Sequence, residues 1–445
     1  MACMKISIIS VDRERIPDPL LPIGAAIVAA SLRAEGHEVR ILDLCHQKEP
    51  GPAIVSHLTA WQPDLVGISL RLLENNLLIG HRSYLEEAKQ VVERVKKASS
   101  CPIVLGGAAY SLFPREVLQF LDVPYGLAGE AEHSLTALVR CIERGQPPDG
   151  VPGACHRAGR RVLVNGLAKV HNFDGSPSPA YDLVDCRKYL DEGAVLPVES
   201  KRGCDLACSF CPESVVSEGA RLKPATLTVQ EIEQLTKQVG TNRLFFTDGV
   251  FHYPPEHTTA LCREMIKRQL DIRWLAGVNP IGLSRKLLAA MREAGCVGVS
   301  LGLDASTDDM LKSYNKGFAQ ADIIQALADL RAVGMPFAIF MLFGGPGETL
   351  DSVRRSLDFL DAVAHDNTVF LNMGIRVYKG TALERIARRE ALIKPRQNML
   401  SPIYYLSREL NESLLDRLEE YCQTRPGWFT TPSLMASSKK STGSL

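Results

Sequence analysis

The spacing of hydrophobic positions in residues 4–145 alternates between two patterns. Short apolar runs predict buried strands, and longer stretches with one apolar face predict helices. The predicted strands comprise residues 5–10, 37–44, 64–70, 101–107 and 125–130. The predicted helices comprise residues 23–36, 51–60, 84–98, 115–121 and 134–145. This alternation predicts an α/β domain at residues 1–145 with a doubly wound, flavodoxin-like (Rossmann-like) parallel sheet, whose ligands bind beyond the carboxyl ends of the strands.

Residues 146–193 lack this alternation. The stretches QPPDGVPG and NFDGSPSPAYD are rich in turn residues, so we predict a linker with one small hairpin at residues 160–166.

The alternation returns in residues 194–393. The predicted strands there comprise residues 194–200, 243–249, 272–278, 296–304, 337–343 and 369–377, and helical stretches follow them. Six successive strand–helix units predict a partial (β/α)6 relative of the eight-unit barrel, with its active site at the strand C-termini. Residues 394–432 are predicted to form a short helical C-terminal segment, and residues 433–445 a disordered polar tail.

The composition is that of an ordinary globular protein, with 45% hydrophobic and 23% charged residues. Lys plus Arg and Asp plus Glu both number 51, so no basic surplus indicates nucleic acid or an anionic membrane as a partner. The first residues lack the pattern of a secretory signal, and no apolar run reaches the roughly 18 residues of a membrane span. We therefore expect a cytoplasmic protein, whose twelve cysteines stay reduced.

Three of these cysteines, Cys204, Cys208 and Cys211, fall within eight residues of the stretch SKRGCDLACSFCPE. Their spacing matches one face of a helix, but Gly203 and Pro212 disfavour a helix here. A structural zinc site would need a fourth ligand, usually from a second Cys or His pair at short spacing, and no such pair follows. An iron–sulfur cluster held by three thiolates fits better, because it leaves one iron free to bind another molecule.

The motif CxxxCxxC after the first barrel strand resembles that of the radical S-adenosylmethionine (SAM) superfamily. The resemblance implies a [4Fe–4S] cluster bound by Cys204, Cys208 and Cys211. It also implies that the unique iron binds the amino and carboxylate groups of SAM, and that electron transfer yields a 5′-deoxyadenosyl radical. Such chemistry belongs to the cofactor, while the protein supplies orientation and a dry site.

Further segments resemble the superfamily's SAM-contacting strand ends. FFTDGVF replaces the usual GGE stretch and implies contacts from Thr247 and Gly249. SLGLD is similar to a GIES-like segment and implies Ser300 and Asp304, and GGPGET implies Gly345. VYKGTAL is similar to a YPGT-like strand, with Lys379 in place of Pro. The polar residues of TDGVFHY are the candidate catalytic residues, namely Asp248, His252 and Tyr253.

The first 145 residues resemble the cobalamin-binding domain fused to one large radical SAM group. The resemblance rests on PIGAAIVAASLRAEGHEVRILD, PDLVGIS, VLGGAAYSLFP and YGLAGEAEHS, and it implies cobalamin contacts from Ser69, Gly106 and Gly107. Other cobalamin domains carry DxHxxG, whose His ligates cobalt. Here Asp43 and His46 are three residues apart, so His46 is not expected to be a cobalt ligand.

This combination resembles the class B radical SAM methyltransferases. We expect radical C-methylation of an unactivated carbon of a small molecule in antibiotic or other secondary metabolism, with aromatic and heteroaromatic carbons as the first class to test. The substrate could also be bound to a carrier protein, and the reductant would be a flavodoxin or ferredoxin.

Three other functions stay open. A related radical SAM enzyme could cyclise or oxidatively rearrange its substrate without methyl transfer. A methylthiotransferase acting on tRNA would need three more cluster cysteines in the N-terminal domain and a C-terminal RNA-binding domain. A non-enzymatic cobalamin or iron–sulfur sensor would bind these cofactors without cleaving SAM.

Overall fold

The computed structural model describes residues 3–16, 18–159 and 161–434. The chain forms two compact units. The first unit contains the residues up to Asn75, Arg82–Leu196 and Lys237–Val239, and the second contains Asn76–His81, Pro197–Thr236 and the residues from Gly240 onward. Among the described residues, no helix is both long and apolar enough to cross a membrane.

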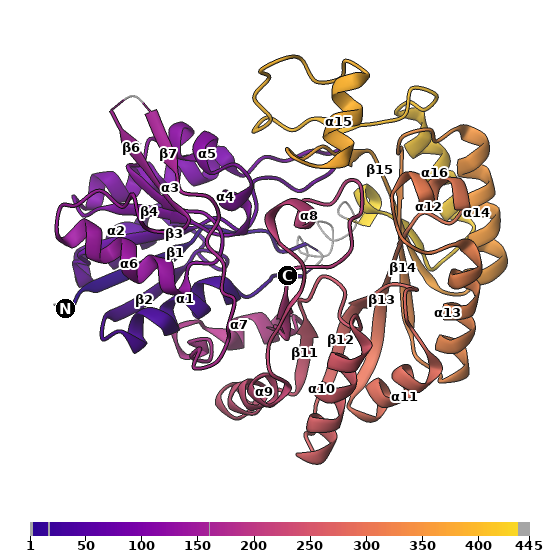
Figure 1. The fold of residues 1–445 in the computed structure, drawn as a ribbon, viewed down its shortest axis with the longest axis horizontal. Coiled ribbons are helices and arrows are strands. Elements are labelled where there is room, and N and C mark those ends of the chain that lie inside the picture. The colour runs from indigo at the N-terminus through magenta and orange to yellow at the C-terminus, as the bar shows by residue number, and fades with distance from the viewer. Residues whose placement is uncertain (1–2, 17, 160, 435–445) are drawn as a thin grey trace. The chain divides into compact units, whose positions relative to one another are not determined.

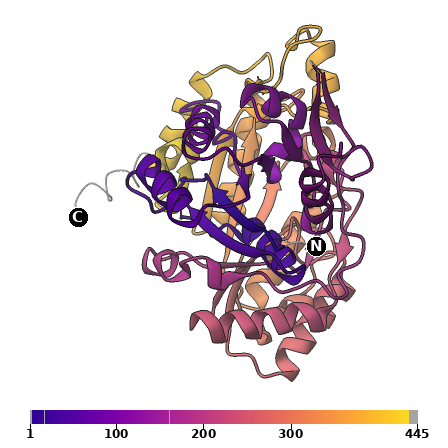
Figure 2. The ribbon, with the colours of Figure 1, turned by 90° about the vertical axis from the view of Figure 1, so that its left-hand side faces the viewer.

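The first unit contains one seven-stranded sheet with the strand order β2-β1-β3-β4-β5-β6-β7. Its strands are β1 (Lys5–Ser10), β2 (Glu38–Asp43), β3 (Leu65–Ser69), β4 (Ile103–Gly106), β5 (Tyr125–Leu127), β6 (Ala154–Ala158) and β7 (Arg161–Val164). Its helices are α1 (Ile23–Ala34), α2 (Pro50–Trp61), α3 (Leu85–Ala98), α4 (Ala108–Leu112), α5 (Pro114–Phe120), α6 (Glu132–Glu143) and α7 (Cys186–Asp191), with a 3-10 turn at Tyr181–Leu183. Figures 1 and 2 show this unit in indigo to magenta.

Strands β1 to β5 are parallel, which confirms the predicted doubly wound sheet. Helix α1 packs beside α6, and α2 packs beside α3. Because helices cover a parallel sheet on both faces, its central strands are buried almost throughout, as in β1, where five of six residues are buried.

Residues 146–193, which the sequence predicts as a linker, instead extend the first unit. The expected hairpin is β6–β7, and β6 pairs antiparallel with β5. Cys155 and Val162 are buried in this hairpin. The predicted range includes β7 but not β6, because turn composition indicates a change of direction and does not show which flanking residues pair.

The second unit contains a seven-stranded sheet with the order β18-β15-β14-β13-β12-β11-β8. Its strands are β8 (Leu196–Val198), β11 (Arg243–Phe246), β12 (Arg273–Val278), β13 (Cys296–Asp304), β14 (Phe337–Phe343), β15 (Thr368–Met373) and β18 (Trp428–Thr430). Two small ladders pair β9 (Lys201–Arg202) with β10 (Arg221–Leu222), and β16 (Ile375–Arg376) with β17 (Tyr404–Tyr405). The helices are α8 (Glu213–Val216), α9 (Ala225–Val239), α10 (Pro255–Lys267), α11 (Arg285–Glu293), α12 (Asp308–Ser313), α13 (Gln320–Ala332), α14 (Leu350–Ala364), α15 (Ala382–Arg389) and α16 (Ser413–Gln423).

The six predicted strands lie side by side in chain order, as expected for successive β/α units. Right-handed crossovers between such neighbours place all the connecting helices on one face of the sheet, and Figure 1 shows α10 to α14 on that face. Residues that point to the helices, such as Leu301 and Ile339, are buried. The alternate residues of β13, β14 and β15 line the opposite face, which we call the inner face, and most of them are only partly buried.

The C-terminal region departs from the predicted helical segment, because two strands, β17 and β18, lie in it. Helix α16 forms as expected, but β18 adds a seventh parallel strand beside β15. Its three residues are too few to show a strand pattern in the sequence. Residues 433 and 434 lie in a short helical turn, and the rest of the predicted disordered tail lies outside the described residues.

Candidate active site

The three clustered cysteines lie in one loop, which runs from β9 to α8 directly after the first strand of the second unit. All three are half-buried free thiols. The loop begins at Gly203, which has φ +80°, and a Cβ atom there would lie 2.2 Å from the carbonyl oxygen of Gly219. Glycine is therefore required at position 203, because this backbone conformation and close approach exclude any side chain.

The middle of the cysteine loop is tied to the segment that follows α12. The backbone N–H of Ser209 donates to the carbonyl oxygen of Tyr314 at 2.9 Å, and the amide of Asn315 donates to that of Ala207 at 2.6 Å. The ring of Phe210 contacts that of Tyr314 edge-on, with 5.4 Å between centroids. These contacts hold the cysteines beside the carboxyl end of β13.

A buried ion pair stands beside two of the cysteines. The Lys316 ammonium lies 2.5 Å from the carboxylate of Asp304, the last residue of β13, and Lys316 is only 5% exposed. Asp304 has φ +60°, an uncommon backbone conformation for a residue other than glycine, and such residues cluster at functional sites. Burial raises the pKa of the Cys208 thiol, and the positive charge of Lys316 opposes that rise. Lys316 would therefore stabilise an anionic group held by Cys208 and Cys211.

The donor set of the cysteine loop suits a cubane cluster. The thiolates of a cubane cluster each bind a different iron, so they surround the cluster without converging on one point. Three thiols on one loop, with a buried ammonium beside two of them, provide such a donor set.

Asp248 connects the next strand to the start of the cysteine loop. Its carboxylate accepts from the backbone N–H of Ser200 at 2.9 Å, from the Ser200 hydroxyl, and from the N–H of Lys201 at 3.3 Å. Burial raises the pKa of Asp248 to about 6, against the opposing effect of these hydrogen bonds. All of these partners belong to the protein, so we infer that Asp248 positions the loop and does not react with substrate.

The predicted catalytic role of His252 also does not suit its surroundings. His252 is fully buried, and its Nε2 donates to the carbonyl oxygen of Ile281 at 2.6 Å. Burial lowers the pKa of its imidazole to about 4, so the ring is neutral at pH 7. Tyr253 is half-buried, and its carbonyl oxygen accepts from the Lys201 ammonium, as does that of Val250. We infer that His252 supports the turn after β11, while Tyr253 stays a candidate for substrate contact.

The predicted SAM contacts fall into two groups. The first group lies at the carboxyl ends of two strands: Thr247 and Gly249 follow β11, and Ser300 and Asp304 are in the last part of β13. None of these four residues is fully buried. A Cβ atom on Gly249 would lie 3.8 Å from that of Cys204, so this glycine is next to the cysteine loop. Gly345 differs, because a Cβ atom there would lie 1.9 Å from the Tyr314 ring. Gly345 is therefore needed for packing, whether or not it also contacts SAM.

Glu348 holds the loop after β14 from inside. Its carboxylate is 2% exposed and accepts from the backbone N–H groups of Gly344 and Gly345, the latter at 3.1 Å. The Ser407 hydroxyl donates to the carbonyl oxygen of Glu348 at 2.6 Å. Burial raises the pKa of the Glu348 carboxyl to about 7.

This raised pKa predicts a pH-dependent stability. Because the folded-state pKa exceeds the ordinary value of 4.5, the contribution of Glu348 is complete below pH 4.5 and is lost as the pH rises to about 7. Between pH 5.5 and 8 the loss is about 2 kcal/mol. We expect Glu348→Gln to remove this part of the pH dependence, measured as the change in melting temperature between these two pH values. Equal changes in the variant and the parent protein would contradict the assignment.

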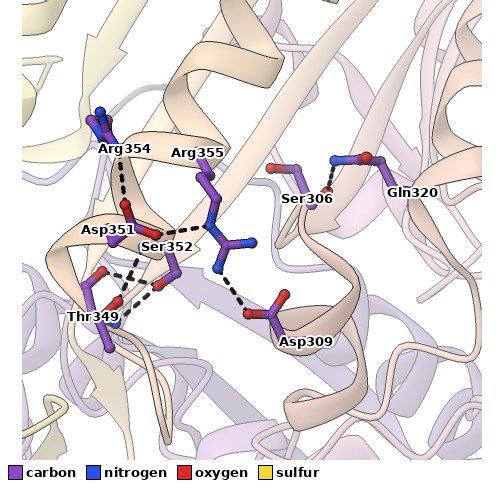
Figure 3. Close-up of polar contacts among 8 residues, drawn as sticks. All are labelled: Ser306, Asp309, Gln320, Thr349, Asp351, Ser352, Arg354 and Arg355. Carbon is purple, nitrogen blue, oxygen red and sulfur yellow. Dashed lines mark hydrogen bonds and ion pairs between the residues drawn. The ribbon is translucent and has the colours of Figure 1, made fainter.

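The helix after this loop has a well-defined start (Figure 3). Thr349 and Ser352 form a reciprocal capping box at the N-terminus of α14, with distances of 2.9 and 3.1 Å. Arg355 of the same helix forms an ion pair with Asp309 of α12 at 3.0 Å, and Figure 3 shows it reaching across. Neither contact needs a ligand, so the loops after β13 and β14 are held in place before any cofactor binds.

In the first unit, the predicted cobalamin contacts lie at the carboxyl edge of the sheet. Ser69 ends β3 and pairs with Gly106, which ends β4. The two glycines differ. A Cβ atom on Gly107, which has φ +105°, would lie 2.4 Å from the carbonyl oxygen of Leu70, whereas one on Gly106 would meet nothing closer than 3.8 Å. Gly107 is required by the fold, and Gly106 leaves an open place where a ligand could approach the backbone.

This difference gives a matched pair of variants. We expect Gly107→Ala to destabilise the protein by about 2 kcal/mol, because it combines a strained backbone with a close contact. Gly106→Val should leave the melting temperature of the apoprotein nearly unchanged but weaken cobalamin binding about tenfold or more, through crowding. Absorbance of bound cobalamin after gel filtration measures the second effect, and normal retention by Gly106→Val would exclude cobalamin from this edge.

His46 lies at the same edge of the sheet, after β2. Its ring contacts the Tyr189 ring edge-on at 4.5 Å, and its Nε2 is 3.3 Å from a carboxylate oxygen of Glu192. The Tyr189 hydroxyl donates to Asp43 at 2.6 Å. His46 thus contacts residues of its own unit, and the expectation that it is not a cobalt ligand stays a prediction.

Three residues that the sequence analysis did not single out are part of this site, namely Lys201, Lys316 and Glu348. Each is charged yet at most 5% exposed, a property that only the fold reveals. Glu348 lies within the motif GGPGET, and its position among three glycines could have identified it from the sequence as a loop residue of the site. Lys201 lies three residues before Cys204, but no pattern in the surrounding sequence indicates that it is buried.

Each of the two units contains residues that match a known protein family. Residues 198–360 match the family model of the radical SAM superfamily, and residues 9–139 match that of the B12 binding domain. The chain therefore carries an N-terminal B12-binding domain followed by a radical SAM domain. It is a cobalamin-dependent radical SAM enzyme, whose cofactors are a [4Fe–4S] cluster, SAM and cobalamin.

The chain is similar to several individual proteins. It is 25% identical to a tryptophan 2-C-methyltransferase of Streptomyces laurentii, across 84% of this chain and 73% of that protein. It is 24% identical to an anaerobic magnesium-protoporphyrin IX monomethyl ester cyclase of Cereibacter sphaeroides, across 75% and 55%. Its fold is similar to that of the radical SAM methyltransferase TsrM from Kitasatospora setae, with a TM-score of 0.83, 20% identity, and coverage of 94% of this chain and 88% of that one.

Proposed function

We propose that this enzyme transfers a methyl group to a carbon atom of a small molecule, with an aromatic or heteroaromatic carbon as the first candidate. The observation that supports this most is the similarity to a tryptophan 2-C-methyltransferase across 84% of the chain, which includes both cofactor domains. When bound, the cofactors supply the carbon-centred radical and the methyl group. A pathway that makes an antibiotic or another secondary metabolite would use such a reaction.

The protein's own residues would hold and shield this chemistry. The cysteine loop would bind the cluster, and Lys316 would balance its negative charge, because the ammonium is buried beside Cys208 and Cys211. Asp304 fixes Lys316 from the end of β13. The hydrogen bonds of Asp248 and Glu348 keep the surrounding loops rigid, so that little rearrangement is needed when SAM binds.

Anaerobic reconstitution tests the proposal. The protein is loaded with iron, sulfide and hydroxocobalamin, and a flavodoxin or ferredoxin system supplies electrons. Tryptophan is the first substrate to try, and SAM with a deuterated methyl group reports the fate of that group. Radical methylation predicts 5′-deoxyadenosine, S-adenosylhomocysteine and a product that has gained the labelled methyl group.

Other outcomes separate the alternatives. S-adenosylhomocysteine and methylated product without 5′-deoxyadenosine would keep methyl transfer but contradict hydrogen abstraction by a radical. The similarity to a cyclase makes a reaction without methyl transfer the second candidate. Consumed substrate and 5′-deoxyadenosine without label in the product would support that candidate and reject methylation.

A further inference from the structure

Three phenylalanines form a ladder across the inner face of the second unit's sheet. Phe340 of β14 pairs with Phe370 of β15, which pairs with Phe429 of β18. Their rings stack, with centroid distances of 4.7 and 5.9 Å and interplanar angles of 23° and 29°. Cross-strand aromatic stacking of this kind fixes the ring planes, so the ladder presents a flat face at each end.

The end of the ladder at Phe340 is open. Phe340 is 39% exposed, although its strand neighbours Ile339 and Met341 are buried. The next position in the same row, on β13, is Gly302. A Cβ atom on Gly302 would meet nothing closer than the carbonyl oxygen of Val278 at 3.7 Å. The row therefore lacks a side chain at the place where a fourth ring would continue the stack.

The neighbouring inner-face residues make this place accessible to a ligand. Ser300 and Ala338, which pair one row earlier, are both small. On the other side along β13 lies Asp304, which is paired with Lys316 and close enough to Cys208 to influence its thiol. A ring above Gly302 would thus lie next to Phe340, with one edge toward the ion pair of Asp304 and Lys316 beside the cysteine loop.

We propose that a flat aromatic ring of the substrate stacks on Phe340 above Gly302, as the fourth member of the ladder. This inference rests on the proposed function and narrows its substrate class to molecules with a planar apolar ring. A ring is a better occupant than an aliphatic chain, because the Phe340 face offers stacking in addition to apolar contact. The absent side chain of Gly302 supplies the space that such a ring needs.

The test uses the reconstituted holoenzyme with saturating SAM and two neutral probes, indole and hydrindane, a saturated bicycle with the same ring sizes. Equilibrium dialysis measures the affinity of each probe. We expect indole to bind more tightly than hydrindane, and Phe340→Leu to weaken indole binding about 2- to 12-fold, as expected from the loss of one aromatic stacking contact. Gly302→Val should abolish indole binding by filling the place. Ile324→Ala is the control, because Ile324 is an exposed apolar residue on α13.

Several results would overturn the inference. Equal affinity for both probes, or unchanged indole binding in Phe340→Leu, would exclude stacking at this place. Weaker SAM binding in Phe340→Leu would assign the ladder to the adenine ring of SAM instead. Cleavage of SAM by the same preparations is measured in parallel. If it is normal while the probes fail to discriminate, the inference fails and the radical SAM assignment stands.

Discussion

Replacing any one of the three loop cysteines, as in Cys208→Ser, is expected to abolish cluster binding and reductive cleavage of SAM. A serine hydroxyl is a much poorer ligand for iron than a thiolate, and the loop has no further cysteine to substitute for it. Iron and sulfide content, visible absorbance and 5′-deoxyadenosine formation measure the effect. Cobalamin binding should stay normal, because Ser69 and Gly106 belong to the first unit.

Cys422→Ser is the matched control for these variants. Cys422 lies in α16 of the same unit and is half-buried, as the three loop cysteines are. We expect it to retain the cluster and the activity. Full 5′-deoxyadenosine formation by Cys208→Ser, or its loss in Cys422→Ser, would contradict the assignment of the cluster to the loop.

Asp248→Ala is expected to have the second largest effect. It leaves the N–H and hydroxyl of Ser200 and the N–H of Lys201 without their acceptor, and each unsatisfied buried donor costs about 1–3 kcal/mol. Removing a buried carboxylate offsets part of this cost, so we expect a net loss of about 3 kcal/mol in the free energy of unfolding. Cluster loading should also fall, because Ser200 and Lys201 lead directly into the cysteine loop.

Asp248→Asn separates positioning from proton transfer. The amide keeps one oxygen acceptor but cannot take up a proton, so a positioning role predicts partial cluster loading and turnover in proportion to that loading. A catalytic proton acceptor predicts a fully loaded cluster with no turnover. Thermal melting, iron content and the rate per cluster are therefore measured on the same samples.

The site could be predicted from the sequence where the signal is local. Three cysteines within eight residues predict the cluster ligands without any knowledge of the fold. Lys316 and Asp304 illustrate the opposite case, because they meet only when the segment after α12 returns to the end of β13. No pattern in the eleven intervening residues indicates that contact, since it depends on tertiary packing.

The fold, like the site, could be predicted from the sequence where the signal is local and not where it depends on tertiary contacts. Strands β13 and β14 match their predicted ranges to the residue, because each is a run of β-forming residues whose helix-facing side chains are apolar and buried. Strand β18 depends on pairing with β15, so its three residues carry little signal, and the predicted hairpin at residues 160–166 includes β7 but not β6. The sequence does not show which of the adjacent glycines, Gly106 or Gly107, the fold requires. The close approach of Leu70 to Gly107 shows it in the structure.

The proposed reaction requires that Cys204, Cys208 and Cys211 hold a cluster whose fourth iron binds SAM. Electron paramagnetic resonance of the reduced, anaerobically reconstituted protein detects such a cluster and its response to SAM. We expect the signal of a reduced [4Fe–4S] cluster that changes when SAM is added, and no such signal in Cys208→Ser, as the cluster assignment requires. A protein that stays colourless and free of inorganic sulfide, or a cluster whose spectrum ignores SAM, would contradict it.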